Sequence, residues 1–193
     1  MQGPDKDKGQ AIIAAAKRIF ALHGYNQARV EDIAQAAGVG KGTVYEYFSS
    51  KQAVFEQVVD AGMSQYMKGL EDEIRRDASP ATKLRQIAVL HMKFVTNHQN
   101  LANIIIADPA IMSPHRARLR EICEQAQDMV AGVIEQGIRM ELFKAVDTLL
   151  ATQAFFGILS SVGVSHLVRQ QSRNPEEVAS LAVDLFLYGL VTA

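Results

Sequence analysis

The sequence predicts an all-α protein with about nine helices, and three observations support this fold class. Apolar residues recur at helical spacing over almost the whole chain. No segment combines alternating polarity with the β-branched and aromatic residues that favour a strand. Three sequence pairs each place an N-cap residue before a proline at the first helical position, which marks a helix start: Ser79-Pro80, Ser113-Pro114 and Asn174-Pro175.

The first three predicted helices are separated by glycines. We expect the first over about 8–22, and Gly24 favours the left-handed conformation that ends such a helix. The second, over about 30–37, has apolar residues at i, i+3, i+4 and i+7. Gly38 then turns the chain into the third helix at about 41–47.

A long fourth helix begins at about residue 50, where Ser49 and Gln52 have capping-box spacing. Its apolar stripe runs from Val54 to Ile74, and we expect it to link two domains. The first domain covers 1–51 and the second covers 52–193. A later helix begins near Asp147, and the remaining helices are expected at about 80–98, 100–108, 114–138, 147–170 and 175–191.

Composition and charge narrow the classes of function. The net charge is −1, with seven Lys and Arg against five Asp and Glu in 1–51, and thirteen against sixteen in 52–193. This weak asymmetry is compatible with a small DNA-facing domain on an acidic body. Polar residues interrupt every long apolar run, so no membrane span is expected. The N-terminus lacks the apolar region of a secretory signal, and one cysteine excludes an internal disulfide, so we expect a cytoplasmic protein.

The segment GVGKGT at 38–43 raises the question of phosphate binding. A P-loop would need glycine at Gln35 and Ser or Thr at Gly42, and the dinucleotide motif would need glycine at Thr43. Both nucleotide motifs also follow a strand, whereas the residues before Gly38 have helical spacing. We therefore favour contact with the phosphate backbone of DNA.

Residues 30–47 have the organisation of a helix-turn-helix. On the third helix, Val44 and Phe48 are expected to face the core. The exposed arc then carries Lys41, Gly42, Thr43, Tyr45, Glu46 and Tyr47. Hydroxyl and ammonium groups reach phosphates, and glycine lets the backbone approach, so this arc suits DNA better than water.

The pattern I-x-x-A-A-x-x-x-F-x-x-x-G-Y, followed by V-x-D-I-A-x-x-A-G-V-x-K-G-T-V-Y-x-Y-F-x-x-K, runs from Ile12 to Lys51. It resembles the DNA-binding domain of the tetracycline-repressor (TetR) family. The resemblance implies an all-helical homodimer with a helix-turn-helix and a divergent C-terminal domain that binds a small effector. It also implies DNA contacts from Lys41, Gly42, Thr43, Tyr45 and Tyr47, and a phosphate contact from Lys51.

The chain departs from the family pattern at two positions. Arg29 replaces the usual Ser or Thr, so it can reach phosphate while the cap of the second helix is lost, at about 0.5–2 kcal/mol if nothing replaces it. Gly40 stands where serine is common. Glu46 is unusual because its carboxylate repels phosphate; it either accepts a hydrogen bond from a cytosine amine or is a solvated charge at the groove edge.

The C-terminal domain contains candidates for an effector pocket, each equally consistent with plain core. The candidates are His91, Phe94, Ile104, Ile105, Met112, Met129, Phe155 and Phe156. Such a pocket would suit a hydrophobic effector such as a fatty acid, an acyl-CoA or a drug, and this half is similar to fatty-acid-metabolism repressors of the family. Cys123 is expected to be a buried apolar residue. We expect neither a cofactor nor a metal site, because His91 and His98 have no third ligand nearby.

Helices 147–170 and 175–191 have apolar faces broader than one chain obviously needs. By resemblance they form the homodimer interface; alternatively, they only close the core of the monomer. The sequence therefore predicts a repressor released from a pseudo-palindromic operator by a hydrophobic small molecule. An all-α enzyme or carrier is a competing hypothesis, against which no catalytic arrangement with usable spacing is found. A nucleoid-type DNA binder without an effector is another.

Overall fold

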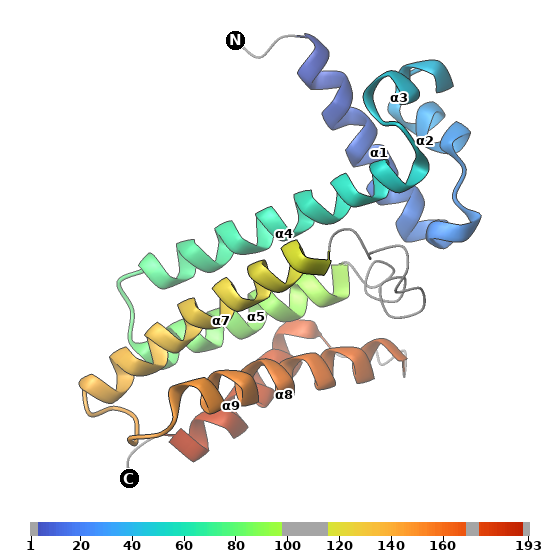
Figure 1. Ribbon diagram of the computed structural model, residues 1–193. Coiled ribbons are helices and arrows are strands. Elements are labelled where there is room, and N and C mark those ends of the chain that lie inside the picture. The colour runs from blue at the N-terminus through green and yellow to red at the C-terminus, as the bar shows by residue number, and fades with distance from the viewer. Residues whose placement is uncertain (1–3, 98–115, 169–173, 191–193) are drawn as a thin grey trace. The chain divides into compact units, whose positions relative to one another are not determined.

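The computed structural model describes residues 4–97, 116–168 and 174–190, and over these residues it contains eight helices and no strand. The all-α prediction is confirmed. The helices in Figure 1 are α1 (Pro4–Gln27), α2 (Val30–Ala37), α3 (Lys41–Tyr47), α4 (Lys51–Arg75), α5 (Pro80–Asn97), α7 (Arg116–Arg139), α8 (Thr148–Val168) and α9 (Pro175–Leu190). The helix expected at 100–108 and the start expected at Ser113-Pro114 lie outside the described residues.

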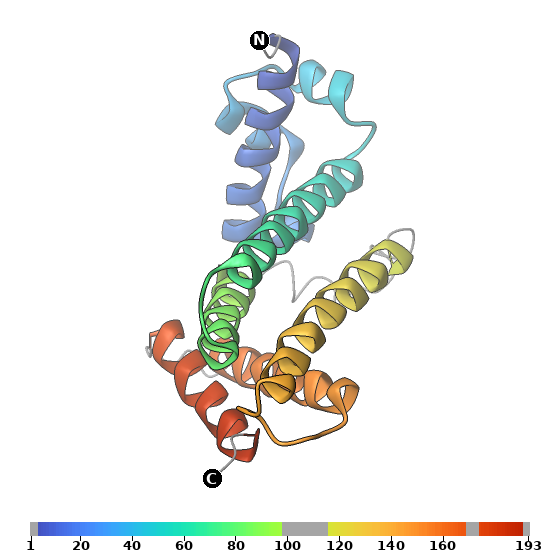
Figure 2. The ribbon, with the colours of Figure 1, turned by 90° about the vertical axis from the view of Figure 1, so that its left-hand side faces the viewer.

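The helices form two compact units. The head unit contains the described residues up to Ser64, and the body unit contains Gln65–Asn97 and the described residues from Ala117 onward. Helix α4 is continuous, and its first part belongs to the head unit while its last part belongs to the body unit (Figures 1 and 2). The domain boundary after residue 51 stays a prediction.

The head unit is built on the mutual packing of α1, α2 and α3. Its interior side chains are almost completely buried: Ile12, Phe20, Ile33, Val44 and Phe55. The rings of Phe20 and Phe55 pack edge to face at a centroid distance of 5.4 Å, which ties the start of α4 to α1. This packing fixes the direction in which α3 presents its outer face.

Two glycines with positive φ shape the head unit. Gly38 has φ 69° and ψ 29°, and its N–H donates to the carbonyl of Gln35, so it ends α2 as predicted. Gly24 has φ 69° and ψ 169°, which breaks α1 where the sequence predicted an end. The prediction was too short, however, because helical backbone resumes after Gly24 and continues to Gln27.

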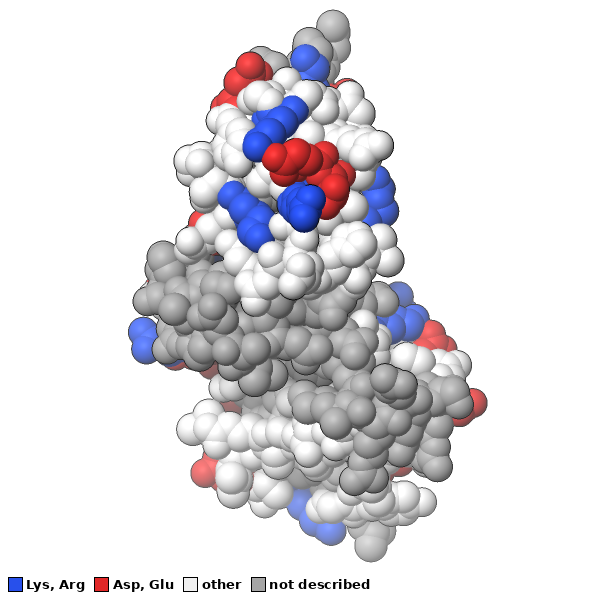
Figure 3. Space-filling model, turned by 90° about the vertical axis from the view of Figure 1, so that its right-hand side faces the viewer, with Lys and Arg blue, Asp and Glu red and all other residues white. Residues whose placement is uncertain are grey.

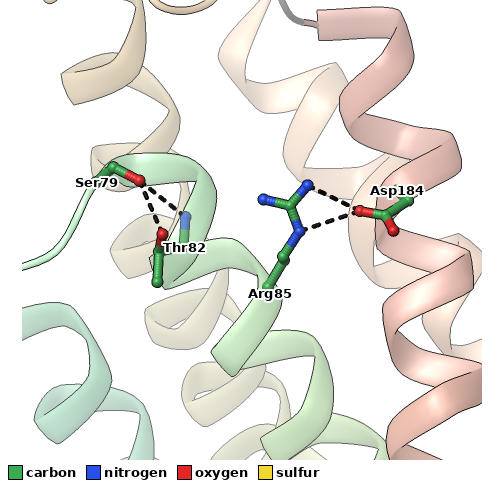
Figure 4. A network of polar contacts seen from close by, with 4 residues as sticks. All are labelled: Ser79, Thr82, Arg85 and Asp184. Atoms are coloured by element: carbon green, nitrogen blue, oxygen red, sulfur yellow. Dashed lines mark hydrogen bonds and ion pairs between the residues drawn. The ribbon is translucent and has the colours of Figure 1, made fainter.

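Most of the predicted helix starts are confirmed by cap hydrogen bonds. Ser79 Oγ accepts from the Thr82 N–H at 3.3 Å (Figure 4), Asp147 Oδ1 from the Leu150 N–H at 3.0 Å, and Asn174 Oδ1 from the Glu176 N–H at 2.9 Å. The predicted capping box at Ser49 was wrong. Ser50 is the cap of α4, because its Oγ accepts from the Ala53 N–H at 3.0 Å.

The body unit has one apolar core to which α4, α5, α7, α8 and α9 all contribute. Helix α5 packs against both α8 and α9. Arg85 of α5 donates from Nε and Nη2 to the Asp184 carboxylate of α9, at 3.0 and 2.8 Å (Figure 4). Core side chains that are almost completely buried include Leu70, Leu84, Ile87, Met92, Val130, Ile134, Phe155, Leu159 and Val183.

Helix α7 corrects one expectation and ends in a tight turn. Cys123 is exposed, although apolar periodicity predicted it to be buried. At the end of α7 the Leu142 and Phe143 N–H groups donate to the Gly137 carbonyl, and Glu141 adopts a left-handed φ of 58°. A Cβ on Gly137 would lie 2.1 Å from the Phe143 ring, so this turn requires glycine there.

Candidate nucleic-acid interface

Helix α3 presents most of the predicted DNA-contacting residues to solvent. Val44 is 1% exposed and faces the core, as predicted. Lys41, Gly42, Tyr45 and Glu46 are exposed, whereas Thr43 and Tyr47 are half-buried. A Cβ at Gly42 would meet no atom within 4 Å, so a flat ligand surface can approach the backbone there.

Tyr47 is held against α1. A Cβ on Gly9 would lie 3.4 Å from the Tyr47 ring, so the missing side chain at Gly9 leaves room for this ring. The Tyr47 ring is also 6.4 Å from that of Phe48, centroid to centroid. Tyr47 therefore packs against α1 and leaves part of its side chain open to solvent.

Arg29 precedes α2 in an extended conformation and makes no side-chain cap hydrogen bond, as the departure from Ser or Thr predicts. Its side chain is exposed. Glu31 and Asp32 in the first turn of α2 partly offset the missing cap, since acidic groups are favourable near a helix N-terminus.

Lys41 forms an ion pair with Glu31, which joins the first turn of α3 to the first turn of α2. Its Nζ lies 2.5 Å from Glu31 Oε1 and 5.9 Å from the centroid of the Tyr45 ring. The hydrogen bond lowers the pKa of the Glu31 carboxyl and raises that of Lys41. Both groups are therefore charged over the whole neutral range.

Lys51, for which a phosphate contact is predicted, has several internal partners. Its ammonium donates to the carbonyls of Tyr25 at 2.8 Å, Ala28 at 3.1 Å and Asn26 at 3.4 Å. It also lies 4.5 Å from the centroid of the Tyr25 ring. A phosphate would have to compete with these carbonyls, which belong to the chain that leaves the Gly24 break.

One face of the head unit carries basic and acidic groups side by side. In Figure 3 acidic atoms lie directly between basic ones on the upper part of the molecule. This pattern agrees with the small charge surplus in the sequence of 1–51.

The body unit holds a polar cluster formed by Tyr66 of α4, His91 of α5 and Ser160 of α8, of which Tyr66 is buried, His91 half-buried and Ser160 exposed. The Tyr66 hydroxyl lies 3.1 Å from His91 Nδ1, and Ser160 Oγ lies 3.5 Å from His91 Nε2. Burial lowers the pKa of His91 to about 4 and raises that of Tyr66 well above its usual value. At neutral pH His91 is therefore uncharged, and one ring nitrogen donates while the other accepts.

His91, a predicted pocket residue, belongs to this cluster, and two others lie beside it. The Tyr66 ring is 4.8 Å from Phe94, and the His91 ring is 5.4 Å from Phe156, centroid to centroid. Phe155 instead points into the core beside Phe186, and Met129 packs against the same core. Ile104, Ile105 and Met112 lie outside the described residues.

Sequence reasoning missed Tyr66 and Ser160. Tyr66 lies within the apolar stripe predicted for α4, and no site role was predicted for Ser160. The signal for Tyr66 was its hydroxyl, because a tyrosine in an apolar stripe needs a partner for its O–H. Nothing in the sequence around Ser160 points to His91, since the two residues are 69 positions apart.

Helices α8 and α9 have both buried and exposed apolar residues. Phe155, Leu159 and Val178 close the core of the body unit. Other apolar side chains are largely open to solvent: Leu149 (60%), Leu150 (64%), Leu181 (59%), Leu185 (75%) and Tyr188 (84%). We call these five residues the outer apolar face. Their exposure is unusual for a surface with no partner.

The described residues contain neither a membrane-spanning helix nor a metal-binding cluster. None of the helices found there is long and apolar enough to cross a membrane. In the same part of the chain, no group of three or more His, Cys, Asp and Glu side chains is placed to hold a metal ion.

Comparison with known proteins gives matches along nearly the whole chain. Residues 12–58 match the family model for bacterial regulatory proteins of the tetR family, and residues 77–190 match a tetracyclin repressor-like C-terminal domain. The chain is 26% identical over 189 residues to the fatty acid metabolism regulator protein of Bacillus subtilis, covering 96% of each. It is 25% identical over 142 residues to the transcriptional activator FasR of Mycolicibacterium smegmatis, covering 73% of this chain and 64% of that protein.

Solved structures agree with these matches. FadR from Bacillus subtilis, solved in complex with stearoyl-CoA, superposes with a TM-score of 0.75 and 26% identity over 93% of this chain and 98% of that chain. FadR from Bacillus halodurans superposes with a TM-score of 0.77 and 26% identity, covering 97% and 96%. The helix-turn-helix, the exposed face of α3 and these matches lead to one conclusion: the chain belongs to the tetR family of bacterial regulatory proteins.

Proposed function

We propose that this protein is a homodimeric transcriptional repressor that binds double-stranded DNA and is released by a hydrophobic acyl effector. DNA binding is assigned to residues 1–51, and effector binding and dimerisation to 52–193. The observation that carries the DNA-binding assignment is the outer face of α3, where Lys41, Gly42 and Tyr45 are exposed at the start of a helix that the core holds in place. Such a face fits the major groove.

The proposed contacts divide by chemistry. Lys41, Thr43, Tyr45 and Tyr47 supply groups for phosphates and base edges, and Gly42 allows close approach. Arg29 and Lys51 are proposed as flanking phosphate contacts, although Lys51 must leave its carbonyl partners. Glu46 is exposed on the same face and is proposed to read a cytosine amine.

The effector is proposed to bind in the body unit beside the Tyr66, His91 and Ser160 cluster. An acyl chain would contact Phe94, Met129 and Phe156, while the hydroxyl groups and the imidazole orient its carbonyl group. The fatty acid regulator of Bacillus subtilis and the stearoyl-CoA complex of FadR support an acyl-CoA as the effector class. The effector releases DNA only to the extent that it binds the DNA-free conformation more tightly.

The homodimer is proposed to form through the outer apolar face of α8 and α9. Sedimentation of the Leu185→Glu variant tests this assignment, because a carboxylate inside an apolar interface carries a large desolvation cost. Leu22→Glu is a matched control, since both leucines are 75% exposed and Leu22 lies in the head unit. We expect Leu185→Glu to be monomeric and Leu22→Glu to be dimeric; a dimeric Leu185→Glu contradicts the assignment.

The overall function is tested by selecting DNA from a random duplex library with the purified protein and then titrating stearoyl-CoA. We expect a pseudo-palindromic sequence, and we expect stearoyl-CoA to release it while coenzyme A alone does not. Stearate has the acyl chain but no thioester, so titrating it separates recognition of the acyl chain from recognition of the thioester. Ser160→Ala, which removes one hydroxyl from the cluster, should need more stearoyl-CoA for release.

Different outcomes point to the competing classes. Binding of stearoyl-CoA without any DNA binding would indicate a carrier or an enzyme. DNA binding that depends steeply on salt but selects no sequence would indicate a nucleoid-type protein.

A further inference from the structure

The ion pair between Glu31 and Lys41 lies on the face that is proposed to meet DNA. Glu31 is in the first turn of α2, and Lys41 is the first residue of α3. Their side chains are 56% and 51% exposed, and the Nζ to Oε1 distance is 2.5 Å. The ammonium that would meet a phosphate is therefore already paired with a carboxylate of the same chain.

The turn does not depend on this ion pair. The Gly38 N–H donates to the Gln35 carbonyl and the Val39 N–H to the Ala34 carbonyl, which closes the end of α2. Val44 and Ile33 are buried in the head unit and hold the two helices together. Exposed ion pairs contribute little to folding stability, so the charge arrangement calls for another explanation.

We propose that Glu31 is an internal competitor for Lys41 that lowers the sequence-independent affinity of the head for DNA. This inference rests on the proposed DNA-binding function. A phosphate can take Lys41 only by displacing the Glu31 carboxylate, which then stays unpaired beside the negatively charged backbone. Each non-specific encounter therefore loses part of the attraction that Lys41 supplies. The net result is a head that relies more on base contacts for its binding energy.

The position of Glu31 agrees with this role. Its carboxylate accepts a hydrogen bond from Lys41 of the next helix, while Arg29, just before α2, adds a weaker attraction. A basic face would lose its selectivity through attraction to any duplex, and a carboxylate placed between cations limits that attraction.

A double-mutant cycle on the full-length protein tests the proposal, with a fluorescent random-sequence duplex as the probe. Glu31→Gln should raise affinity for this duplex by about two- to fivefold, the range that an exposed ion pair covers. Its affinity should also fall more steeply with salt, with a slope larger by up to about 0.9, because Lys41 then neutralises a phosphate without leaving a carboxylate unpaired. Thermal melts confirm that each variant is folded.

The Lys41→Gln background separates this mechanism from a general charge effect. In that background Glu31→Gln should change the affinity by much less than in the wild type. Asp7→Asn is a charge-matched control, because it also removes an exposed carboxylate from the head unit, on α1; its effect should be the same with and without Lys41.

Two results would overturn the proposal: no gain for Glu31→Gln, or an equal gain in both backgrounds, which would make Glu31 a diffuse negative charge. A wild-type protein that binds neither random nor selected duplexes would instead overturn the proposed function. Conversely, selected-sequence binding by the wild type with no effect of Glu31→Gln removes only the competitor role.

Discussion

The contacts of Lys51 predict that its main role is to hold the head unit together. In the Lys51→Met variant the aliphatic part of the side chain is kept and the ammonium is lost. Three carbonyls, those of Tyr25, Asn26 and Ala28, then lose a charged donor. The contact with the Tyr25 ring at 4.5 Å is lost with them.

The size of the effect follows from these contacts. Hydrogen bonds from a charged donor contribute about 1.5–3 kcal/mol, and an exposed cation–π contact about 0.5–1 kcal/mol. Lys51 is only half-buried and its bond to Asn26 is long at 3.4 Å, so water can partly replace the ammonium. We therefore expect the free energy of unfolding of the head unit to fall by about 2 kcal/mol.

Urea unfolding followed by far-UV circular dichroism measures this loss, and hydrogen exchange localises it. Exchange should accelerate at the amides of Ala28 and Ile33, which bond to the carbonyls of Gly24 and Arg29 next to the affected segment. Lys17→Met is the control, because Lys17 is an exposed lysine on α1. A loss for Lys51→Met below about 0.5 kcal/mol, the range of ordinary surface substitutions, would refute the reasoning.

The other predictions concern DNA contact, helix termination and pH. Tyr45→Ala should weaken binding of the selected duplex in a gel-shift titration and leave the melting temperature unchanged, because this ring is 47% exposed; unchanged DNA affinity would contradict its assignment. Gly137→Ala should destabilise the body unit by about 1–3 kcal/mol in urea, since the new methyl group would overlap the Phe143 ring. Glu141→Gly should stabilise it by about 1 kcal/mol, since glycine accepts the left-handed φ without strain. Burial depresses the pKa of His91 to about 4 in the folded state, below its usual value of about 6.5. As pH falls, the unfolded state therefore binds this proton before the folded state does, and stability is lost from about pH 6.5 towards 4. The wild type should lose about 2 kcal/mol more than His91→Gln between about pH 7 and about pH 5, and parallel curves would show that His91 is not buried in its neutral form.

The sequence by itself determined the elements with a local cause. Gly38 ends α2, and Ser79 and Asn174, each followed by a proline, cap the starts of α5 and α9. These signals act within a few residues. Apolar spacing also placed Val44 in the core and left Lys41, Tyr45 and Glu46 on the exposed side of α3. The fixed spacings from Ile12 to Lys51 were sufficient to indicate the family.

Only the tertiary structure decided which polar groups meet. Lys51 lies 26 positions from Tyr25, and His91 lies 25 from Tyr66 and 69 from Ser160, so helical periodicity carries no information about these contacts. The same limit explains Cys123, whose side of α7 was predicted to be buried from spacing alone. Lys41 is the clearest case. The sequence predicted only that it is exposed and contacts DNA, whereas folding placed the Glu31 carboxylate against it, because the turn at Gly38 brings the first turns of two helices within reach of one ion pair.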